Sequence, residues 1–169
     1  MTSQIPNRVS AVAAGGPTIY VDADACPVKE EVYRVVRRYS LKLCIVANSF
    51  IDVPPEPGFE RVMVDGGFDA ADNWIAERAG AGDVVITADI LLAGRCIKVG
   101  AAVIGNDGRP FTPASIGMAL ASRALMADLR AMGEVTGGPR PMARADRSRF
   151  LSALDEAIVR LARARGAGA

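Results

Sequence analysis

The chain alternates short apolar runs with longer stretches in which apolar residues recur every three or four positions. Short runs rich in branched apolar residues indicate buried strands, and the longer repeat indicates amphipathic helices. Five strands are predicted, at residues 18–21, 43–47, 61–64, 84–87 and 101–104. Five helices are predicted between and after them, at about residues 27–39, 69–79, 90–97, 113–132 and 146–164. This alternation predicts a three-layer α/β/α sandwich around a mainly parallel five-stranded sheet.

Proline and glycine indicate where several of these elements begin and end. Pro27 is expected at the first position of a helix, where its missing N–H does no harm. Gly80 and Gly133 are each expected to close a helix as a C-terminal cap. Residues 1–17 are interpreted as a flexible leader, and residues 18–165 as a single domain that includes a basic C-terminal helix.

Composition excludes several kinds of catalysis. The 169 residues include no histidine, which excludes Ser-His-Asp and Cys-His mechanisms and histidine-bound zinc. The three cysteines, Cys26, Cys44 and Cys96, lack the spacing of a zinc site. Cys26 is interpreted as structural, because neighbouring acids disfavour its thiolate. No export signal is recognisable and no apolar run approaches the ~20 residues of a membrane span, so a cytoplasmic location is expected.

Charge is unevenly distributed along the chain, although the net charge is only +1. Residues 139–169 hold seven arginines against three acids, whereas residues 1–138 hold thirteen basic and sixteen acidic groups. The net charge alone indicates no polyanionic partner, whereas a basic tail on a mildly acidic body leaves nucleic acid as a candidate; a solvated helix is the alternative. Aromatic residues are few and scattered, so recognition of a nucleic-acid backbone is expected rather than stacking on successive bases.

Aspartates follow two of the predicted strands directly. Asp22 and Asp24 follow the first strand, and Asp89 follows the fourth. Because the carboxyl ends of parallel strands gather at one edge, where open α/β sheets bind their ligands, these carboxylates are expected to converge. Asp69 and Asp72, at the start of the helix predicted from residue 69, are further candidates. Crowded carboxylates repel one another unless a cation lies between them, and Mg²⁺ or Mn²⁺ is the expected ion.

Most of these acids also have a structural explanation. Asp69, Asp89 and Asp24 could each cap the helix that follows. Asp72 could pair with Asp69 in a capping-box-like arrangement, or favour the helix dipole. Asp22 ends a strand and has no helix of its own to cap. Capping therefore explains the acids one at a time, but not their common location at strand ends.

An acidic pocket of this kind suits hydrolysis of a phosphodiester. Paired metal ions can activate water, orient the scissile phosphate and stabilise the leaving oxygen. The candidate substrate-binding groups around the pocket are Lys29, Asn48, Thr87, Arg140, Arg144, Arg147 and Arg149. The basic groups would hold phosphates, and Asn48 and Thr87 would act as neutral donors. For the basic groups, exposed helix residues without a ligand are the alternative.

Four segments resemble one known family. The runs YVDADACPVKEEVYRV, VMVDGGFDAADNWIAE, VVITADILLA and GGPRPMARADRSRFLSALDEAI look like the YaiI/YqxD family of uncharacterised bacterial proteins, over nearly all of residues 18–164. That family is similar in turn to PIN-like domains, which often act as Mg²⁺- or Mn²⁺-dependent ribonucleases. The resemblance implies the strand order 3-2-1-4-5. It also implies a metal cluster of Asp22, Asp24, Asp72 and Asp89, with Asp69 as a weaker addition.

Three functions follow as hypotheses. The first is a metal-dependent nuclease acting on RNA or single-stranded nucleic acid, with Asp22, Asp24, Asp72 and Asp89 as its catalytic residues. The second is a non-catalytic module on the same fold that binds RNA or a protein. The third is a phosphatase similar to haloacid dehalogenases. The segment Asp22-Ala23-Asp24 resembles the nucleophile and acid of that family, although no convincing acidic pair follows downstream. The oligomeric state stays open, a homo-oligomer included.

Overall fold

A single parallel sheet lies at the centre of the protein. The computed structural model describes residues 16–24, 26–67, 69–133 and 141–167. The five strands are β1 (Thr18–Asp22), β2 (Lys42–Ala47), β3 (Phe59–Met63), β4 (Val84–Ile86) and β5 (Ala102–Ile104). They lie in the order β3-β2-β1-β4-β5, and all four neighbouring pairs are parallel. The predicted parallel sheet and the strand order implied by the resemblance are both confirmed.

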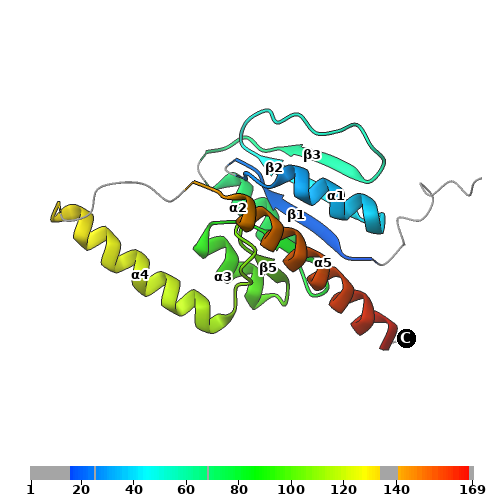
Figure 1. Cartoon of the computed structure of the whole chain (residues 1–169). Coiled ribbons are helices and arrows are strands. Elements are labelled where there is room, and N and C mark those ends of the chain that lie inside the picture. The colour runs from blue at the N-terminus through cyan, green and yellow to red at the C-terminus, as the bar shows by residue number, and fades with distance from the viewer. Residues whose placement is uncertain (1–15, 25, 68, 134–140, 168–169) are drawn as a thin grey trace, which may run out of the picture.

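Helices cover both faces of this sheet (Figure 1). They are α1 (Lys29–Tyr39), α2 (Ala70–Arg78), α3 (Ile90–Lys98), α4 (Pro113–Ala131) and α5 (Arg144–Ala167). Helices α1 and α5 pack on one face, and α2 and α3 pack on the other. The predicted three-layer sandwich is therefore confirmed, and each predicted strand lies within two residues of its observed bounds.

The strand sequences explain why both faces are covered. Side chains of β1 alternate between the two faces, as in any strand. Ile19 and Val21 pack with Phe150 and other residues of α1 and α5, whereas Tyr20 packs in the second cluster with Ile75 and Leu92. Because the strand is apolar at all three positions, it is stable only when helices exclude water from both sides.

Three predicted helix boundaries are wrong. Helix α1 begins at Lys29, because Pro27 lies in the turn after β1 and Val28 takes the N-cap position. Gly80 does not cap α2: Ala79 leaves the helix in an extended conformation, and the Asp83 carboxylate accepts the Gly80 N–H at 3.0 Å. Helix α5 begins two residues before the predicted Asp146.

The early start of α5 has a local cause. The Asp146 carboxylate accepts the backbone N–H of Ala143 at 2.9 Å, which satisfies a donor one turn before it. Asp146 is thus inside the first turn and not at the helix start. In contrast, the Gly133 cap is confirmed, with a φ of +73° and an N–H bond to the carbonyl of Arg130.

Helix α4 differs from the other helices because none of its residues is buried. It begins with a capping box in which Thr112 and Ser115 exchange hydrogen bonds, at 2.7 and 3.0 Å. It contacts α3 through its first turns, where Ile116 lies 3.8 Å from a Cβ built on Gly94, and then extends away from the sheet (Figure 1). Its tertiary support is therefore confined to one end.

Two predictions concern residues that lie outside the described ranges. One is the leader, of which residues 1–15 are not described, and the other is Arg140 as a substrate-binding group. Among the helices that the structure describes, none is long and apolar enough to cross a membrane.

Candidate functional site

The aspartates predicted from the sequence surround one cleft at the carboxyl edge of the sheet. Because β1 and β4 are neighbours, with Val21 opposite Ile86, the segments that follow the two strands lie side by side. The cleft has a volume of about 460 Å³ and is lined by Asp22, Asp24, Asn48, Ala71, Asp72, Ala88 and Asp89. Four of the five predicted metal ligands thus lie together, and Asp69 is outside this lining.

Thr87 connects the two strand ends beneath the cleft. Its side chain is fully buried, and its hydroxyl donates to Asp22 Oδ2 at 2.9 Å. The Thr87 hydroxyl oxygen, Oγ1, in turn accepts the backbone N–H of Asp89 at 2.9 Å. Thr87 was predicted to donate to a substrate, but its hydroxyl proton is directed at Asp22. It acts as a positioning residue that sets Asp22 and Asp89 relative to each other.

Asp24 connects the loop after β1 to the loop after β2. Its two carboxylate oxygens accept the backbone N–H of Asn48 at 3.1 and 3.0 Å, and the Ser49 hydroxyl lies 3.5 Å away. This arrangement replaces the helix-capping role that was the structural alternative for Asp24. It also holds Asn48 at the edge of the cleft.

The two helix starts at the cleft differ in how they are capped. Asp89 is the N-cap of α3, and its Oδ1 accepts the N–H groups of Leu91 at 2.8 Å and Leu92 at 3.1 Å. The capping alternative is therefore realised for Asp89, while Oδ2 takes part in neither bond and the residue still lines the cleft. Asp69 occupies the N-cap position of α2 without a capping bond from its side chain. Capping thus does not account for Asp69 or for Asp72.

Comparison with known proteins identifies relatives over the same residues. The model of a family described as uncharacterised and named YaiI/YqxD matches residues 20–160. The chain belongs to the YaiI/YqxD family. No solved structure matches it.

Curated relatives agree with this assignment. A UPF0178 protein of Bradyrhizobium diazoefficiens is 61% identical over 147 residues, which is 87% of this chain and 88% of the relative. A UPF0178 protein of Sphingopyxis alaskensis is 62% identical over 148 residues, 87% of this chain and 96% of the relative. A third, from Nitrobacter winogradskyi, is 61% identical over 146 residues, which is 86% of this chain and 93% of the relative. The YaiI/YqxD match therefore includes every residue of the cleft.

Mutual repulsion marks the acids of this YaiI/YqxD protein as an electrostatic cluster. Burial raises the pKa of Asp72 to about 6, and the charges of Asp89, Asp22 and Asp69 add to the effect. Burial also raises the pKa of Asp22, and the charges of Asp24 and Asp89 contribute, against the hydrogen bond from Thr87. Burial and neighbouring charges therefore make Asp22 and Asp72 costly to ionise, which is the situation that a bound cation relieves.

The donor set fits a hard cation that keeps part of its water shell. Among the described residues, no three acidic or cysteine side chains are grouped closely enough to hold an ion unaided. Mg²⁺ usually binds through one or two carboxylates, several waters and substrate phosphates, and does not require a cage of protein ligands. A cleft of about 460 Å³ lined by four carboxylates has room for such an ion and its waters.

The predicted basic groups are arranged differently from the acids. Lys29 Nζ donates to the carbonyl of Cys26 at 2.9 Å, and Arg147 donates to the carbonyl of Pro27 at 2.7 Å. Arg147 also pairs with Glu31 at 3.3 Å. Both side chains thus hold the turn between β1 and α1. Arg144 is exposed at the start of α5, and its role as a phosphate contact stays a prediction.

One basic residue near the cleft was missed. Arg95 of α3 donates to the Asn73 side chain at 2.8 Å. Its positive charge offsets part of the increase that burial and the neighbouring acids cause in the pKa of Asp72. Its proximity depends on how α2 packs against α3, which no local sequence pattern records. The interpretation of Cys26 as structural fits its environment, because burial raises the pKa of its thiol.

Replacing Asp72 by asparagine is expected to stabilise the metal-free protein at high pH. A carboxyl whose pKa is raised to about 6 contributes most to stability below its ordinary pKa of 3.8, and this contribution is lost as pH rises through 6. The substitution should raise the free energy of unfolding by on the order of 1 kcal/mol at pH 8, after allowance for solvent screening. The gain should vanish near pH 4.

Urea unfolding at both pH values, with a chelator present, measures this difference. Asp128→Asn, on the exposed α4, provides a control with the same change of charge. A gain for Asp72→Asn that is equal at pH 4 and pH 8 would contradict the raised pKa of Asp72.

Proposed function

We propose that the protein is a metal-dependent nuclease that hydrolyses phosphodiester bonds of RNA or single-stranded nucleic acid. The observation that carries this proposal is the convergence of Asp22, Asp24, Asp72 and Asp89 on one cleft. They come from three separate segments, which follow β1, begin α2 and follow β4. The carboxyl edge of a parallel sheet is where such folds bind their ligands, and an oxygen-only donor set favours Mg²⁺ or Mn²⁺.

The carboxylates would have distinct roles. Asp22 and Asp89 are the principal ligands in this proposal, because Thr87 positions both and Asp89 Oδ2 is not used in capping. Bound there, the ion would supply a more acidic water and stabilise charge on the leaving oxygen. Asp72, which lines the same cleft, would complete the site or orient the attacking water. Asp24 would keep the Asn48 loop in place beside the phosphate.

Electrostatic contacts to the strand would come from the rim of the cleft. Arg95 lies near Asp72, and Arg144 begins α5, whose first turns reach the β1–α1 turn through Arg147. Each phosphate neutralised by such a group releases counterions, so affinity should fall steeply as salt rises. The non-catalytic alternative predicts the same salt dependence, but no dependence on Asp22. Aspartyl-phosphate trapped on Asp22 would instead favour the phosphatase.

Calorimetric titration with Mn²⁺ tests the acidic site directly. We expect the wild type to bind the ion and the double variant Asp22→Asn/Asp89→Asn to lose binding, because two of its ligands are gone. The matched control is Asp52→Asn/Asp128→Asn, which removes the same charge from exposed positions outside the cleft and should bind normally. Equal binding by the two double variants would place the ion elsewhere. No binding by the wild type, even with a single-stranded oligonucleotide present, would refute the metal site.

A further inference from the structure

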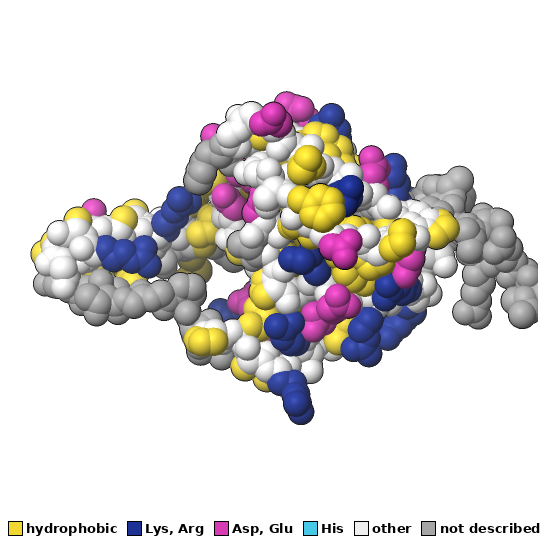
Figure 2. All heavy atoms as spheres, turned by 90° about the horizontal axis from the view of Figure 1, so that it is seen from above, with side chains coloured by type: hydrophobic (Ala, Val, Ile, Leu, Met, Phe, Trp, Pro, Cys, Tyr) yellow, Lys and Arg dark blue, Asp and Glu magenta, His cyan; other side chains and the backbone are white. Residues whose placement is uncertain are grey.

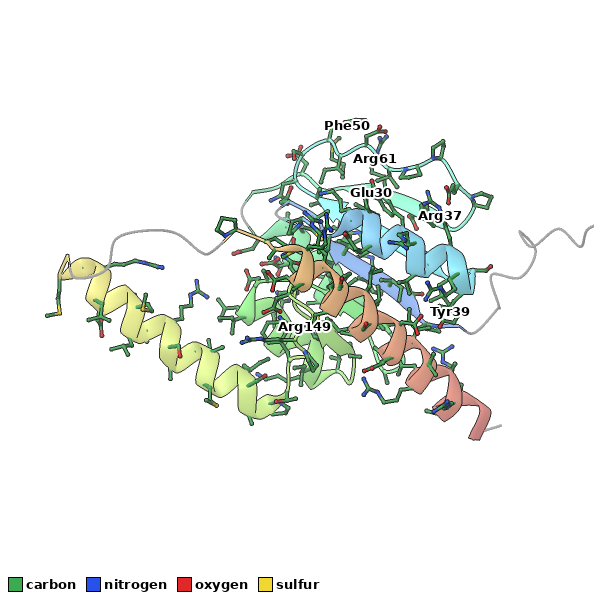
Figure 3. The ribbon with its side chains drawn as sticks, in the orientation of Figure 1. Glu30, Arg37, Tyr39, Phe50, Arg61 and Arg149 are labelled. Carbon is green, nitrogen blue, oxygen red and sulfur yellow. The ribbon has the colours of Figure 1, made fainter. Side chains whose placement is uncertain are left out.

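Phe50 and Arg61 form an exposed stacked pair beside the cleft. Phe50 is 65% exposed, and the Arg61 guanidinium lies over its ring, with Cζ 4.3 Å from the ring centroid. Figure 3 shows the two side chains together at the outer edge of β3. The pair thus presents an aromatic ring and a cation together to solvent.

Other arginine–aromatic contacts in the described part of the chain have a structural use. Arg37 lies over Tyr33 and Phe59, but it also pairs with Glu56 at 2.6 Å. Arg78 lies over Trp74, donates to its backbone carbonyl and pairs with Glu77. Arg61, in contrast, has no acidic partner among the residues that the structure describes. Its charge is therefore available to an external anion.

Phe50 lies in the loop after β2, at the same edge of the sheet as the acidic cleft, and Arg61 reaches its ring from the middle of β3. Phe50 follows Asn48, which lines the cleft, by two residues, so their Cα atoms are at most about 7 Å apart. Hydrogen bonds from Asn48 and Ser49 to Asp24 anchor this loop. Met63, which is 62% exposed, pairs with Ala47 at the end of β2 and extends the apolar surface. The surface is thus held in place before any ligand arrives.

We infer that Phe50, Arg61 and Met63 form a stacking platform for an unpaired nucleobase of the strand that enters the cleft. Aromatic rings and guanidinium groups stack on bases of any sequence, and the cation also attracts the neighbouring phosphate. Figure 2 views the molecule from above, and hydrophobic, basic and acidic side chains intermingle on the face that it shows. The inference rests on the proposed function and narrows its substrate to single strands, because a paired base cannot present its face.

This platform differs from the backbone recognition expected from composition. The low aromatic content argues against a row of stacking residues, and the platform contains only one aromatic ring. One ring, two residues along the chain from Asn48 of the cleft, is enough to hold a single base. It would fix the position of the strand without selecting its sequence.

Fluorescence anisotropy with two labelled oligonucleotides tests the inference. Both have about ten nucleotides; one carries adenine bases throughout, and the other has the same backbone with abasic central positions. Ca²⁺ replaces Mg²⁺, because it accepts the same oxygen ligands in a looser geometry. Phe50→Leu should weaken binding of the base-bearing strand about 5- to 100-fold and leave the abasic strand unchanged. Phe50→Trp should bind at least as well as the wild type.

Met118→Ala is the control, because Met118 is similarly exposed on the distant α4. The platform is refuted if Phe50→Leu binds the base-bearing strand as the wild type does. It is also refuted if both strands weaken equally, or if the wild type does not distinguish them. Cleavage of the same strand in Mn²⁺ reports separately on the nuclease. Weaker binding by Phe50→Leu together with no cleavage by the wild type would support the platform and refute the nuclease. Cleavage by the wild type with unchanged binding by Phe50→Leu would support the nuclease and refute the platform.

Discussion

Asp22→Asn is expected to lower the rate of Mn²⁺-dependent cleavage of a single-stranded RNA by about 10³-fold. Asparagine keeps the size of the side chain and can still meet the Thr87 hydroxyl, so the fold should persist. What disappears is the negative charge, which is the property that an ion in the cleft requires. Loss of an outer-shell partner typically costs 10–100-fold, and loss of a ligand should exceed that.

Two comparisons make this result specific. Thr87→Val removes the hydroxyl while keeping the shape of the side chain, and should cost about 10–100-fold through misplacement of Asp22. Asp52→Asn, at an exposed position outside the cleft, should cleave normally. Steady-state rates across a Mn²⁺ titration measure all three variants. Wild-type turnover by Asp22→Asn at saturating Mn²⁺ would end the assignment of this carboxylate.

Gly108→Ala is expected to lower the free energy of unfolding by about 2–5 kcal/mol. Gly108 lies in the turn after β5 with a φ of +84°, where a side chain costs roughly 1–2 kcal/mol. A Cβ there would also lie 2.7 Å from the Phe150 backbone nitrogen and 2.8 Å from the carbonyl of Arg149. These atoms belong to α5, so relief of the contact requires the helix to move off the sheet, an overpacking cost of about 1–3 kcal/mol.

The chain contains a matched control for this substitution. Gly133 also has a positive φ, of +73°, but a Cβ at that position meets nothing within 4 Å. Gly133→Ala should therefore cost only about 1 kcal/mol, the part due to backbone conformation. Urea unfolding of both variants separates the two contributions. Equal losses would show that α5 does not press on the turn as closely as the structure has it.

The fold was predictable because the sequence pattern of each segment indicates whether it forms a strand or a helix. Continuous apolar runs such as Ile19–Val21 fit only strands buried on both faces, and the intervening helical repeats require crossovers between parallel strands. The helix boundaries were less predictable, because they depend on contacts that a local pattern does not contain. Pro27 lies in a turn while the buried Val28 takes the N-cap position, and the Asp83 carboxylate accepts the Gly80 N–H that a glycine cap would use.

The acidic residues of the site were predictable for a different reason. Parallel topology brings the ends of β1 and β4 to one edge whatever the side chains are, and the strand order implied by the resemblance makes the two strands neighbours. The function of Thr87 could not be anticipated, because a hydroxyl at a strand end serves a substrate or a neighbour equally well. Arg95 and the Phe50–Arg61 pair were missed, since each depends on contacts between separate segments. Sequence therefore indicates where the acidic residues lie, and packing decides what surrounds them.

The exposure of α4 implies that this helix can unfold locally while the rest of the domain stays folded. Amide protons in β1 and β4 are protected by fully buried neighbours, so they exchange with solvent only when the whole domain unfolds. Those along most of α4 have no buried side chain to protect them, and helix–coil fraying is enough to release them. Hydrogen exchange in this helix is consequently a property of its own 19 residues and not of the domain.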